Sequence, residues 1–368
     1  MENVKKLGFG LMRLPKLDGE IDVEQFKRMV DIFMENGFNY FDTAYGYDAG
    51  KSEEAAKIAI IDRYPRESFY FATKLPAWAG AKTAEDAREM FWTSLRRTGA
   101  GYFDFYLLHN LGDGREESFE RFGIWDFAKE LKDKGLVKRV GFSFHDRADL
   151  LDEILNKHPE AEFVQLQINY ADWEDNAVQS RRCLEVARAH GKKVIVMEPV
   201  KGGLLAKLPE KAAEILRSVD PEASQASWAV RFAASQEGII TVLSGMSNVE
   251  QMENNVSFMR DFKPLSDAEY EAIERVRDIL AQSRGVPCTG CRYCVKDCPM
   301  GVKIPQIFEA LNRYMTYGDL AAAKSNYGWE TRLGGKADEC VGCGACESVC
   351  PQHIAVPDEL KKAAELFA

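Results

Sequence analysis

The protein has 368 residues, of which 46% are hydrophobic and 29% are charged, and its formal net charge is -10. No apolar run approaches the roughly 18 residues that cross a bilayer, so no membrane span is expected. A net charge of -10 without a concentrated basic face argues against binding to nucleic acid. The length predicts two domains, a large core of about 250 residues and a module of about 100.

The opening sequence, MENVKKLGFGLMRLP, lacks the apolar segment and the small-residue cleavage site of a signal peptide, which predicts a cytoplasmic protein. The cytoplasm keeps thiols reduced, so the nine cysteines are not expected to form disulfides. Cys183, within an apolar helical segment, is expected to be a small buried hydrophobic residue.

Eight short apolar runs alternate with amphipathic segments in the first two thirds of the chain. The runs cover residues 7–12, 38–43, 69–74, 104–109, 138–144, 163–168, 193–197 and 239–244. Several are almost continuously apolar, as parallel strands buried on both faces are. Eight strand-helix repeats predict a (β/α)8 barrel. The alternative is an open doubly wound sheet, but the G-x-G-x-x-G sequence it would often carry after the first strand is absent.

The segment after the first run illustrates the predicted helices. Asp22 is expected to cap a helix, Gln25 to complete a capping box, and Gly37 to end the helix in a left-handed conformation. If the barrel is correct, functional groups should gather at the carboxyl ends of the strands. Six polar residues lie at or just beyond those ends, namely Asp42, Lys74, His109, Ser143, Asn169 and Glu198.

The chain after the barrel is predicted to hold a different kind of domain. We expect the barrel to occupy residues 1–265, a connecting helix residues 266–285, and a small domain residues 286–368. This last part contains two C-x2-C-x2-C-x3-C-P cassettes, formed by Cys288, Cys291, Cys294 and Cys298 and by Cys340, Cys343, Cys346 and Cys350. The spacing predicts iron-sulfur ligation, with two zinc sites as the alternative. Ile307, Leu311 and Tyr314 have helical spacing, and a last helix is expected over residues 356–368, so the small domain should be mainly helical.

Three motifs of the barrel resemble the signatures of the aldo/keto reductase family: FDTAYGYDAGKSEE, ATK and YLLHN. The resemblance implies a catalytic tetrad of Asp42, Tyr47, Lys74 and His109. Tyr47 would protonate the alkoxide formed by hydride addition, Lys74 would stabilise the phenolate, Asp42 would hold Lys74, and His109 would orient the substrate oxygen. Tyr45 is a rival for the role of Tyr47, although the spacing favours Tyr47.

The same resemblance implies a nicotinamide cofactor, although several expected contacts differ. The positions that would bind it are Ser143, Gln165, Asn169, Met197, Gly245, Gln251 and Asn254. Phe144 stands where the family has an Asn, Met197 where it has a stacking Tyr, and Gln251 where an Arg reads the 2′-phosphate of NADPH. A neutral Gln offers no charge-assisted contact to a phosphate. NAD(H), NADP(H), a flavin in the same cleft and the absence of a tightly bound organic cofactor therefore all remain open.

The paired cassettes resemble bacterial two-cluster ferredoxins, in which the fourth cysteine of each run ligates the other cluster. The resemblance implies two 4Fe-4S clusters. One would be held by Cys288, Cys291, Cys294 and Cys350, and the other by Cys340, Cys343, Cys346 and Cys298.

Together, the two parts predict an oxidoreductase that reduces a small-molecule carbonyl, or oxidises an alcohol, and exchanges electrons through two clusters, with a redox partner protein as one electron source or acceptor. A second hypothesis makes the chain an electron carrier whose barrel is a docking scaffold or a flavin site. A third makes the clusters a structural cap.

Overall fold

The computed structural model describes residues 3–112, 114–283, 285–296 and 298–368, which form two compact units. The first unit comprises Met1–Glu174, Val178–Ala206 and Ala223–Leu265. The second comprises Asp175–Ala177, Lys207–Glu222 and Ser266–Ala368. Among the described residues, no helix is both long and apolar enough to cross a membrane.

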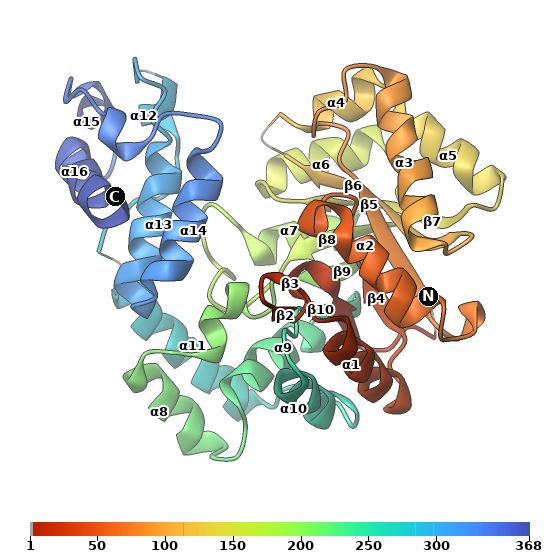
Figure 1. Ribbon diagram of the computed structural model, residues 1–368. Coiled ribbons are helices and arrows are strands. Elements are labelled where there is room, and N and C mark those ends of the chain that lie inside the picture. The colour runs from red at the N-terminus through yellow and green to blue at the C-terminus, as the bar shows by residue number, and fades with distance from the viewer. Residues whose placement is uncertain (1–2, 113, 284, 297) are drawn as a thin grey trace. The chain divides into compact units, whose positions relative to one another are not determined.

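The first unit is built on a closed barrel of parallel strands (Figure 1). Its strands are β1 (Leu7–Gly10), β4 (Tyr40–Asp42), β5 (Tyr70–Leu75), β6 (Phe103–Leu111), β7 (Val137–Phe144), β8 (Phe163–Gln167), β9 (Lys193–Met197) and β10 (Ile239–Ser244). Neighbouring strands follow chain order, and β1 pairs with both β4 and β10, which closes the ring. The predicted (β/α)8 barrel is therefore confirmed and the open sheet excluded. A short hairpin, β2 (Lys16–Leu17) and β3 (Glu20–Ile21), follows β1.

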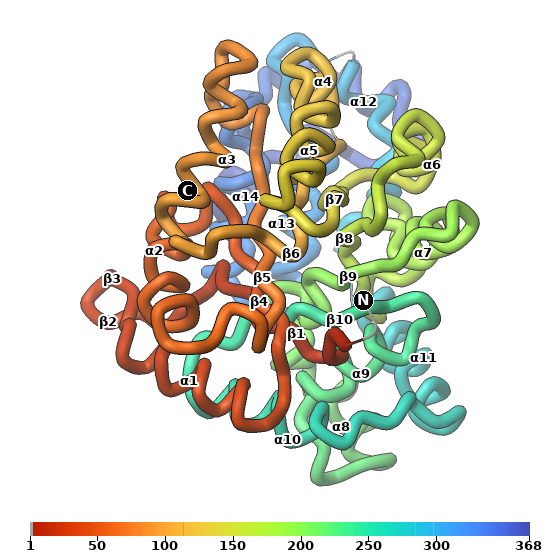
Figure 2. The backbone as a smooth tube through the Cα atoms, turned by 90° about the vertical axis from the view of Figure 1, so that its right-hand side faces the viewer, coloured from red at the N-terminus to blue at the C-terminus, as the bar shows by residue number. Residues whose placement is uncertain are grey.

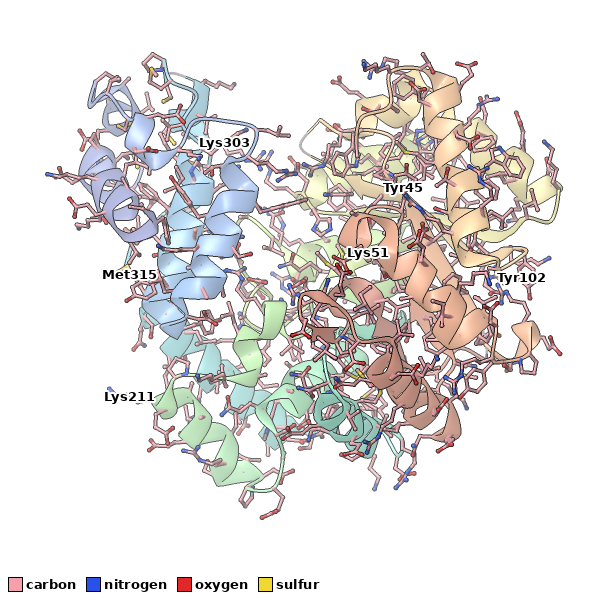
Figure 3. All side chains as sticks on the ribbon, in the orientation of Figure 1. Tyr45, Lys51, Tyr102, Lys211, Lys303 and Met315 are labelled. Carbon is pink, nitrogen blue, oxygen red and sulfur yellow. The ribbon has the colours of Figure 1, made fainter. Side chains whose placement is uncertain are left out.

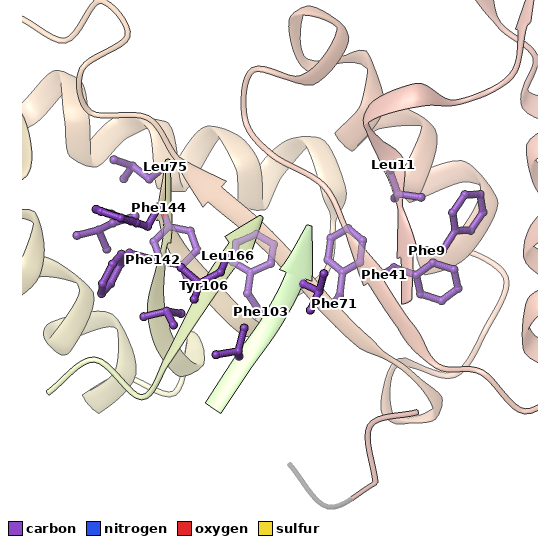
Figure 4. Close-up of a cluster of buried hydrophobic side chains, with 14 of the residues drawn as sticks. Phe9, Leu11, Phe41, Phe71, Leu75, Phe103, Tyr106, Phe142, Phe144 and Leu166 are labelled. Atoms are coloured by element: carbon purple, nitrogen blue, oxygen red, sulfur yellow. The ribbon is translucent and has the colours of Figure 1, made fainter. Parts of the chain in front are cut away.

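Alternate residues of the strands build two separate apolar layers. Tyr40, Phe105 and Phe163 come from alternate strands of the barrel and belong to one cluster, with neighbouring ring centroids 5.1 Å apart. Residues next to them in sequence belong to a larger cluster that also includes the helices; Phe41 and Tyr106 are examples (Figure 4). This is the alternation expected when the barrel interior is filled by side chains and the outer face is covered by helices.

Helices follow the strands and cover the barrel. In the first unit they are α1 (Val23–Glu35), α2 (Lys51–Ala56), α3 (Ala84–Thr98), α4 (Glu116–Arg121), α5 (Ile124–Asp133), α6 (Ala148–Lys157), α7 (Ser180–Ala189), α9 (Gln225–Ser235) and α10 (Val249–Met259). The helices α1 and α10 pack side by side although they lie at opposite ends of the barrel sequence (Figures 1 and 2). This packing follows from ring closure, because β1 and β10 are neighbours.

The start of α1 corrects one detail of the prediction. Asp22 caps the helix, since its Oδ1 accepts a hydrogen bond from the Gln25 backbone N at 3.0 Å, and Gly37 has a left-handed φ of +80°. The predicted capping box is wrong, however. The backbone N of Asp22 donates to the Pro15 carbonyl at 2.8 Å, so the Gln25 side chain instead donates to the Asp22 carboxylate at 3.2 Å.

The second unit is helical; it combines the segment after the barrel, for which helices were expected, with residues 175–177 and 207–222 from within the predicted barrel range. It contains α8 (Glu210–Val219), α11 (Asp267–Gln282), α12 (Tyr293–Lys296), α13 (Ile304–Tyr317), α14 (Leu320–Thr331), α15 (Ala345–Ser348) and α16 (Val356–Phe367). The helix predicted over residues 266–285 is observed as α11, and Arg284 lies outside the described residues. Helices α13 and α14 pack side by side after a turn at Gly318, whose φ is +70° (Figure 1). Ile307 and Leu311 of α13 are buried in the apolar cluster of this unit.

Candidate functional site

Four polar residues from β4, β5, β6 and the turn after β4 meet at the mouth of the barrel. Asp42 ends β4, Lys74 lies near the end of β5, and His109 lies near the end of β6. The Lys74 ammonium donates to the Asp42 carboxylate, to the Tyr47 hydroxyl at 3.2 Å and to the Thr43 carbonyl at 2.8 Å. The rings of Tyr47 and His109 are 5.8 Å apart between centroids. The structure thus brings together all four residues of the predicted tetrad.

The electrostatics of this group follow from burial and from the charge of Lys74. Burial alone would lower the pKa of Lys74, but Asp42 and Tyr47 outweigh it and raise that pKa, so Lys74 stays protonated. Burial raises the pKa of Tyr47 above 10.0, and the neighbouring Lys74 ammonium opposes the rise without cancelling it. Burial and the Lys74 charge lower the pKa of His109 well below 6.5. At neutral pH the site therefore holds a cationic lysine, a protonated tyrosine and a neutral histidine.

Tyr45, the rival tyrosine, has a different environment. Figure 3 labels Tyr45 on the ribbon. The Tyr45 ring lies 4.6 Å from the Arg97 guanidinium carbon, and the Tyr45 backbone carbonyl accepts a hydrogen bond from Arg97 at 3.0 Å. Arg97 also pairs at 3.2 Å with the buried Glu53 carboxylate, which accepts a hydrogen bond from Thr73 at 2.7 Å. Tyr45 thus packs on a guanidinium that ties its loop to β5, and Tyr47 is the tyrosine that reaches Lys74.

Two residues predicted to bind nicotinamide lie beside the tetrad. The Gln165 amide on β8 donates to the Asp42 carboxylate at 3.1 Å. The Ser143 hydroxyl on β7 accepts a hydrogen bond from the Asn110 backbone N at 2.7 Å. Phe144, the next residue of β7, is only 2% exposed and belongs to the apolar cluster of strands and helices. The site therefore keeps a hydroxyl and an amide near the tetrad.

Asn169 and Met197 occupy the loops after β8 and β9. The Asn169 amide donates to Asp172 at 2.8 Å and to the Glu198 carbonyl at 3.1 Å, so it joins the two loops. Asp172 also forms an ion pair with Lys201 at 2.5 Å, in which the two side chains are 1% and 6% exposed. Met197 ends β9 and is partly buried. The sequence reasoning missed the Asp172–Lys201 pair, because the two residues are distant in the chain.

The remaining predicted positions belong to the loop and helix after β10. Gly245 directly follows β10. Gln251, which is exposed, accepts a hydrogen bond from the Ser247 backbone N at 2.8 Å through its side-chain oxygen. Asn254 accepts a hydrogen bond from the Ser224 hydroxyl at 2.8 Å. These residues lie where barrel enzymes often bind phosphate groups.

Arg13 is a further cation at this edge of the barrel that the sequence reasoning missed. It follows β1 and lies 3.6 Å from the Glu198 carboxylate. A Cβ atom added to Gly202 would lie 3.4 Å from the Arg13 guanidinium, and one added to Gly245 would lie 4.0 Å from the Arg13 Cβ. Gly202 and Gly203 both have positive φ, and a Cβ at Gly203 would meet nothing within 4 Å. An arginine beside two successive glycines fits an anionic diphosphate. Its position in the turn after a strand was a signal that could have identified it.

The cysteines of the second unit surround two hollows. Cys288, Cys291, Cys294 and Cys350 line one, together with Ile304, Phe308 and Ile354. Cys298, Cys340, Cys343 and Cys346 line the other. In each set, three cysteines come from one cassette and the fourth from the other cassette. This is the division that the resemblance to two-cluster ferredoxins implies.

The chemistry of these hollows fits iron-sulfur clusters. Thiolates are the ligands that such clusters require, and the walls are largely apolar. Burial raises the pKa of Cys294 to about 12, so cluster binding there must displace a proton. Within the part of the chain that the structure describes, no three His, Cys, Asp or Glu side chains are grouped as ligands of a single metal ion. Cys183 is buried on α7, as predicted.

Comparison with known proteins yields matches for both parts of the chain. The sequence model of the aldo/keto reductase family matches residues 6–278, and that of the 4Fe-4S dicluster domain matches residues 287–355. The uncharacterized oxidoreductase YqkF of Bacillus subtilis is 24% identical over 307 residues, which cover 74% of this chain and 92% of that protein. L-galactose dehydrogenase of Arabidopsis thaliana is 25% identical over 296 residues, 75% of this chain and 91% of the plant protein.

Solved structures agree with the sequence matches. The holo form of the aldo-keto reductase AKR11C1 from Bacillus halodurans superposes with a TM-score of 0.59 at 25% identity, covering 74% of this chain and 92% of that one. An aldo-keto reductase from Klebsiella pneumoniae in complex with NADPH shares the fold, with a TM-score of 0.58 at 22% identity over 74% of this chain and 91% of that one. Because the family match spans most of its length, the chain belongs to the aldo/keto reductase family of oxidoreductases and carries a 4Fe-4S dicluster domain after its barrel.

Proposed function

We propose that this protein interconverts a small-molecule carbonyl and its alcohol at the barrel mouth and exchanges electrons through two 4Fe-4S clusters. The observation that carries the proposal is the hydrogen-bonded group of Asp42, Lys74 and Tyr47 beside His109, in a chain that also places four cysteines around each of two hollows. We further propose a catalytic domain at residues 1–265, a connecting helix at 266–285, a cluster domain at 286–368 and a cytoplasmic location.

The four residues of the tetrad can donate the proton that carbonyl reduction requires. When bound, a nicotinamide cofactor would supply the hydride that reduces the carbonyl carbon. The substrate oxygen then gains negative charge and needs a proton, which Tyr47 holds at neutral pH. Lys74, 3.2 Å from the Tyr47 hydroxyl, stabilises the phenolate that remains, and Asp42 keeps Lys74 in place. The neutral imidazole of His109 can hydrogen-bond the substrate oxygen without adding a second cation.

The residues that would hold the cofactor lie along one side of the mouth. Ser143 and Gln165 would contact the nicotinamide, and Arg13 with the glycine loop at Gly202 would contact the diphosphate. The side-chain oxygen of Gln251 accepts from the Ser247 backbone, so this position offers no cation to a 2′-phosphate. We therefore propose NAD(H) or NADP(H) as the cofactor, with no strong preference for the latter arising from Gln251.

The cysteine-lined hollows would hold the clusters, which transfer electrons singly. Carbonyl reduction needs two electrons and two protons. A hydride and the Tyr47 proton together satisfy that balance and would leave the nicotinamide oxidised. Two reduced clusters could return two electrons, which with one proton would reduce the nicotinamide again, and a partner protein would supply the clusters with electrons. The number of clusters thus matches the number of electrons that one turnover needs.

The decisive experiment follows cluster colour during turnover. Protein with clusters reconstituted anaerobically is mixed with NADH or NADPH and with a panel of aldehydes, ketones and alcohols, while visible absorption is recorded. We expect absorption of the clusters to bleach or recover in step with substrate conversion, and Tyr47→Phe to abolish that response to carbonyls. Cluster absorption that stays constant throughout turnover would refute the electron exchange.

An electron carrier that uses the barrel only for docking is the second candidate. It is favoured by the burial of Phe144 in the apolar core and by Met197, which cannot stack on a nicotinamide as an aromatic ring does. This candidate predicts no carbonyl or alcohol turnover with any cofactor. Turnover that disappears in Tyr47→Phe would exclude docking as the main role of the barrel.

A further inference from the structure

Strand β6 is irregular at the barrel mouth, directly after the tetrad histidine. Leu108 pairs with Phe142 and Leu111 with Phe144, so β6 has one more residue than β7 between these two pairs. Asn110 lies in this bulge and has a left-handed backbone with φ of +60°. Bulges of this kind redirect side chains and are common next to active sites.

The backbone of the bulge is held by three side chains from different segments. The backbone N of Asn110 donates to the Ser143 hydroxyl at 2.7 Å, and the Arg115 guanidinium donates to the Asn110 carbonyl at 2.9 Å. The Trp78 indole donates to the His109 carbonyl at 2.7 Å. These contacts bind the backbone N and carbonyl of Asn110 and the carbonyl of His109, so surrounding side chains hold the conformation of the bulge.

The side-chain oxygen of Asn110, by contrast, lacks a hydrogen-bond partner among the described residues. This oxygen, Oδ1, is buried. The Ser143 oxygen accepts from the Asn110 backbone, and its own hydroxyl hydrogen has no acceptor within the described ranges. A buried acceptor and a hydroxyl donor are therefore joined at one bulge. Buried polar groups in native proteins almost always have partners, so this pair points to a ligand.

Phe144, the residue after Ser143 on β7, cannot provide an amide contact to a cofactor. Phe144 stands where related proteins are expected to supply an Asn, and its side chain is 2% exposed in the apolar cluster near Phe142 (Figure 4). No polar contact to a cofactor can come from that side chain. Asn110 lies on the adjacent strand β6, is hydrogen-bonded to the same Ser143, and carries a side-chain amide.

We propose that Asn110 recognises the nicotinamide carboxamide, taking over the amide contact that Phe144 cannot make. This inference rests on the proposed nicotinamide cofactor. The carboxamide has an NH2 donor and a carbonyl acceptor, which match the Asn110 Oδ1 and the Ser143 hydroxyl hydrogen. Both partners are held by the same hydrogen bond between Asn110 and Ser143, so the recognition is preorganised.

The test compares two nucleotides that differ only in this group. In 3-acetylpyridine adenine dinucleotide a methyl ketone replaces the carboxamide, so the carbonyl remains and the NH2 donor is lost. Kd values for NAD⁺ and for this analogue are measured by titration calorimetry on the full-length protein with its clusters. We expect the wild type to bind NAD⁺ about tenfold more tightly, equivalent to ~1.4 kcal/mol. Asn110→Gly, which tolerates the positive φ, should reduce the preference to about onefold.

Two further variants make the result specific. Asn110→Asp keeps a side-chain oxygen acceptor and should retain the preference for NAD⁺. Asn156→Ala removes an exposed asparagine of α6 and should leave both Kd values unchanged. A preference that survives in Asn110→Gly overturns this inference and leaves the proposed function standing. A wild type that binds neither nucleotide overturns the inference together with the nicotinamide cofactor of the proposed function.

Discussion

Lys74 is the residue on which the chemistry proposed for the barrel mouth depends, because it contacts both an acid and a base of the tetrad. Its side chain is fully buried between the Asp42 carboxylate and the Tyr47 hydroxyl. A buried ammonium is stable only when it is paired, and Asp42 provides that pairing. The charge is therefore available to stabilise a phenolate on Tyr47 without a further rearrangement.

Replacing each of the two tyrosines in turn with phenylalanine tests which of them is the proton donor. Tyr47→Phe should lower kcat for carbonyl reduction by about 10²- to 10⁴-fold, the usual contribution of a positioned acid, while cofactor Kd stays unchanged. Tyr45→Phe is the matched control and should retain turnover, since its ring still packs on Arg97. Steady-state kinetics and nucleotide titrations measure both effects. Equal losses in the two variants would contradict the assignment of Tyr47.

The pH dependence of turnover should reflect the same group. Reduction requires protonated Tyr47, whose pKa is raised above 10.0 by burial, and neutral His109, whose pKa is lowered well below 6.5 by burial and by Lys74. We therefore expect kcat/KM for reduction to be flat between pH 6.5 and 10.0 and to fall only at higher pH. Oxidation needs the phenolate and should rise with pH over the same range. A reduction profile with a midpoint near neutrality would contradict these directions.

At the scale of elements, a buried ion pair joins the loops after β8 and β9. Asp172 in the first loop pairs with Lys201 in the second, and Asn169 donates both to Asp172 and to the carbonyl of Glu198. Lys201 and Glu198 have φ values of +49° and +54°, which are unfavourable for residues other than glycine. The ion pair therefore stabilises a loop conformation that the backbone by itself would not favour.

Removal of one member of this pair should destabilise the first unit strongly. Asp172→Asn removes the carboxylate that pairs with the buried Lys201 ammonium and should lower the free energy of unfolding by about 3–5 kcal/mol. The double variant Asp172→Asn with Lys201→Met should recover part of that loss, because the buried ammonium is then removed as well. Urea unfolding followed by circular dichroism measures both. A double variant as unstable as Asp172→Asn would show that the ion pair is not the cause.

The stability that the Asp172–Lys201 ion pair contributes should depend on pH in a definite direction. Burial alone would raise the pKa of Asp172, but Lys201 together with hydrogen bonds from Asn169 and Gln167 outweighs burial and lowers the pKa below 3.8. A carboxyl whose pKa is depressed on folding stabilises the protein above its unfolded value and loses that effect as pH falls through the folded value. The difference in stability between wild type and Asp172→Asn should therefore persist down to about pH 4 and shrink below it.

At the scale of the whole molecule, the second unit joins two cassettes that are distant in sequence. Cys350 lines the hollow of the first cassette, and Cys298 lines that of the second. Ile304, at the start of α13, lines both hollows. Neither hollow is complete without the other cassette, so the two proposed clusters are expected to form together and to support the fold of this unit.

Serine variants can show which cysteines share a cluster. Cys350→Ser should alter the electron paramagnetic resonance spectrum of the reduced protein in the same way as Cys291→Ser, because both residues line one hollow. Cys298→Ser should resemble Cys343→Ser. Cys183→Ser, on α7, should keep the full iron content of about eight atoms per chain. If Cys350→Ser instead resembled Cys343→Ser, each cassette would hold its own cluster.

Much of this protein could be predicted from the sequence, because the relevant signals are local. Strand runs such as 193–197 and 239–244 coincide with β9 and β10, since continuous apolar stretches of this length predict buried parallel strands. Cysteine spacing within each cassette is likewise local, and so is the position of Asp42, Lys74 and His109 at strand ends. Local patterns also predicted α16 and the cap of α1.

Other features were decided only by tertiary structure, because they depend on which segments meet when the barrel closes. The motif spacing favoured Tyr47 over Tyr45, but it could not show that Tyr45 packs on Arg97 while Tyr47 reaches Lys74, since both tyrosines occupy the same loop. The bulge at Asn110 exists only where β6 pairs with β7. Arg13 lies near Gly245 because β1 and β10 are neighbours in the closed ring. Spacing along the chain thus determined the elements and the candidate groups, whereas ring closure determined which of those groups are close enough to act together.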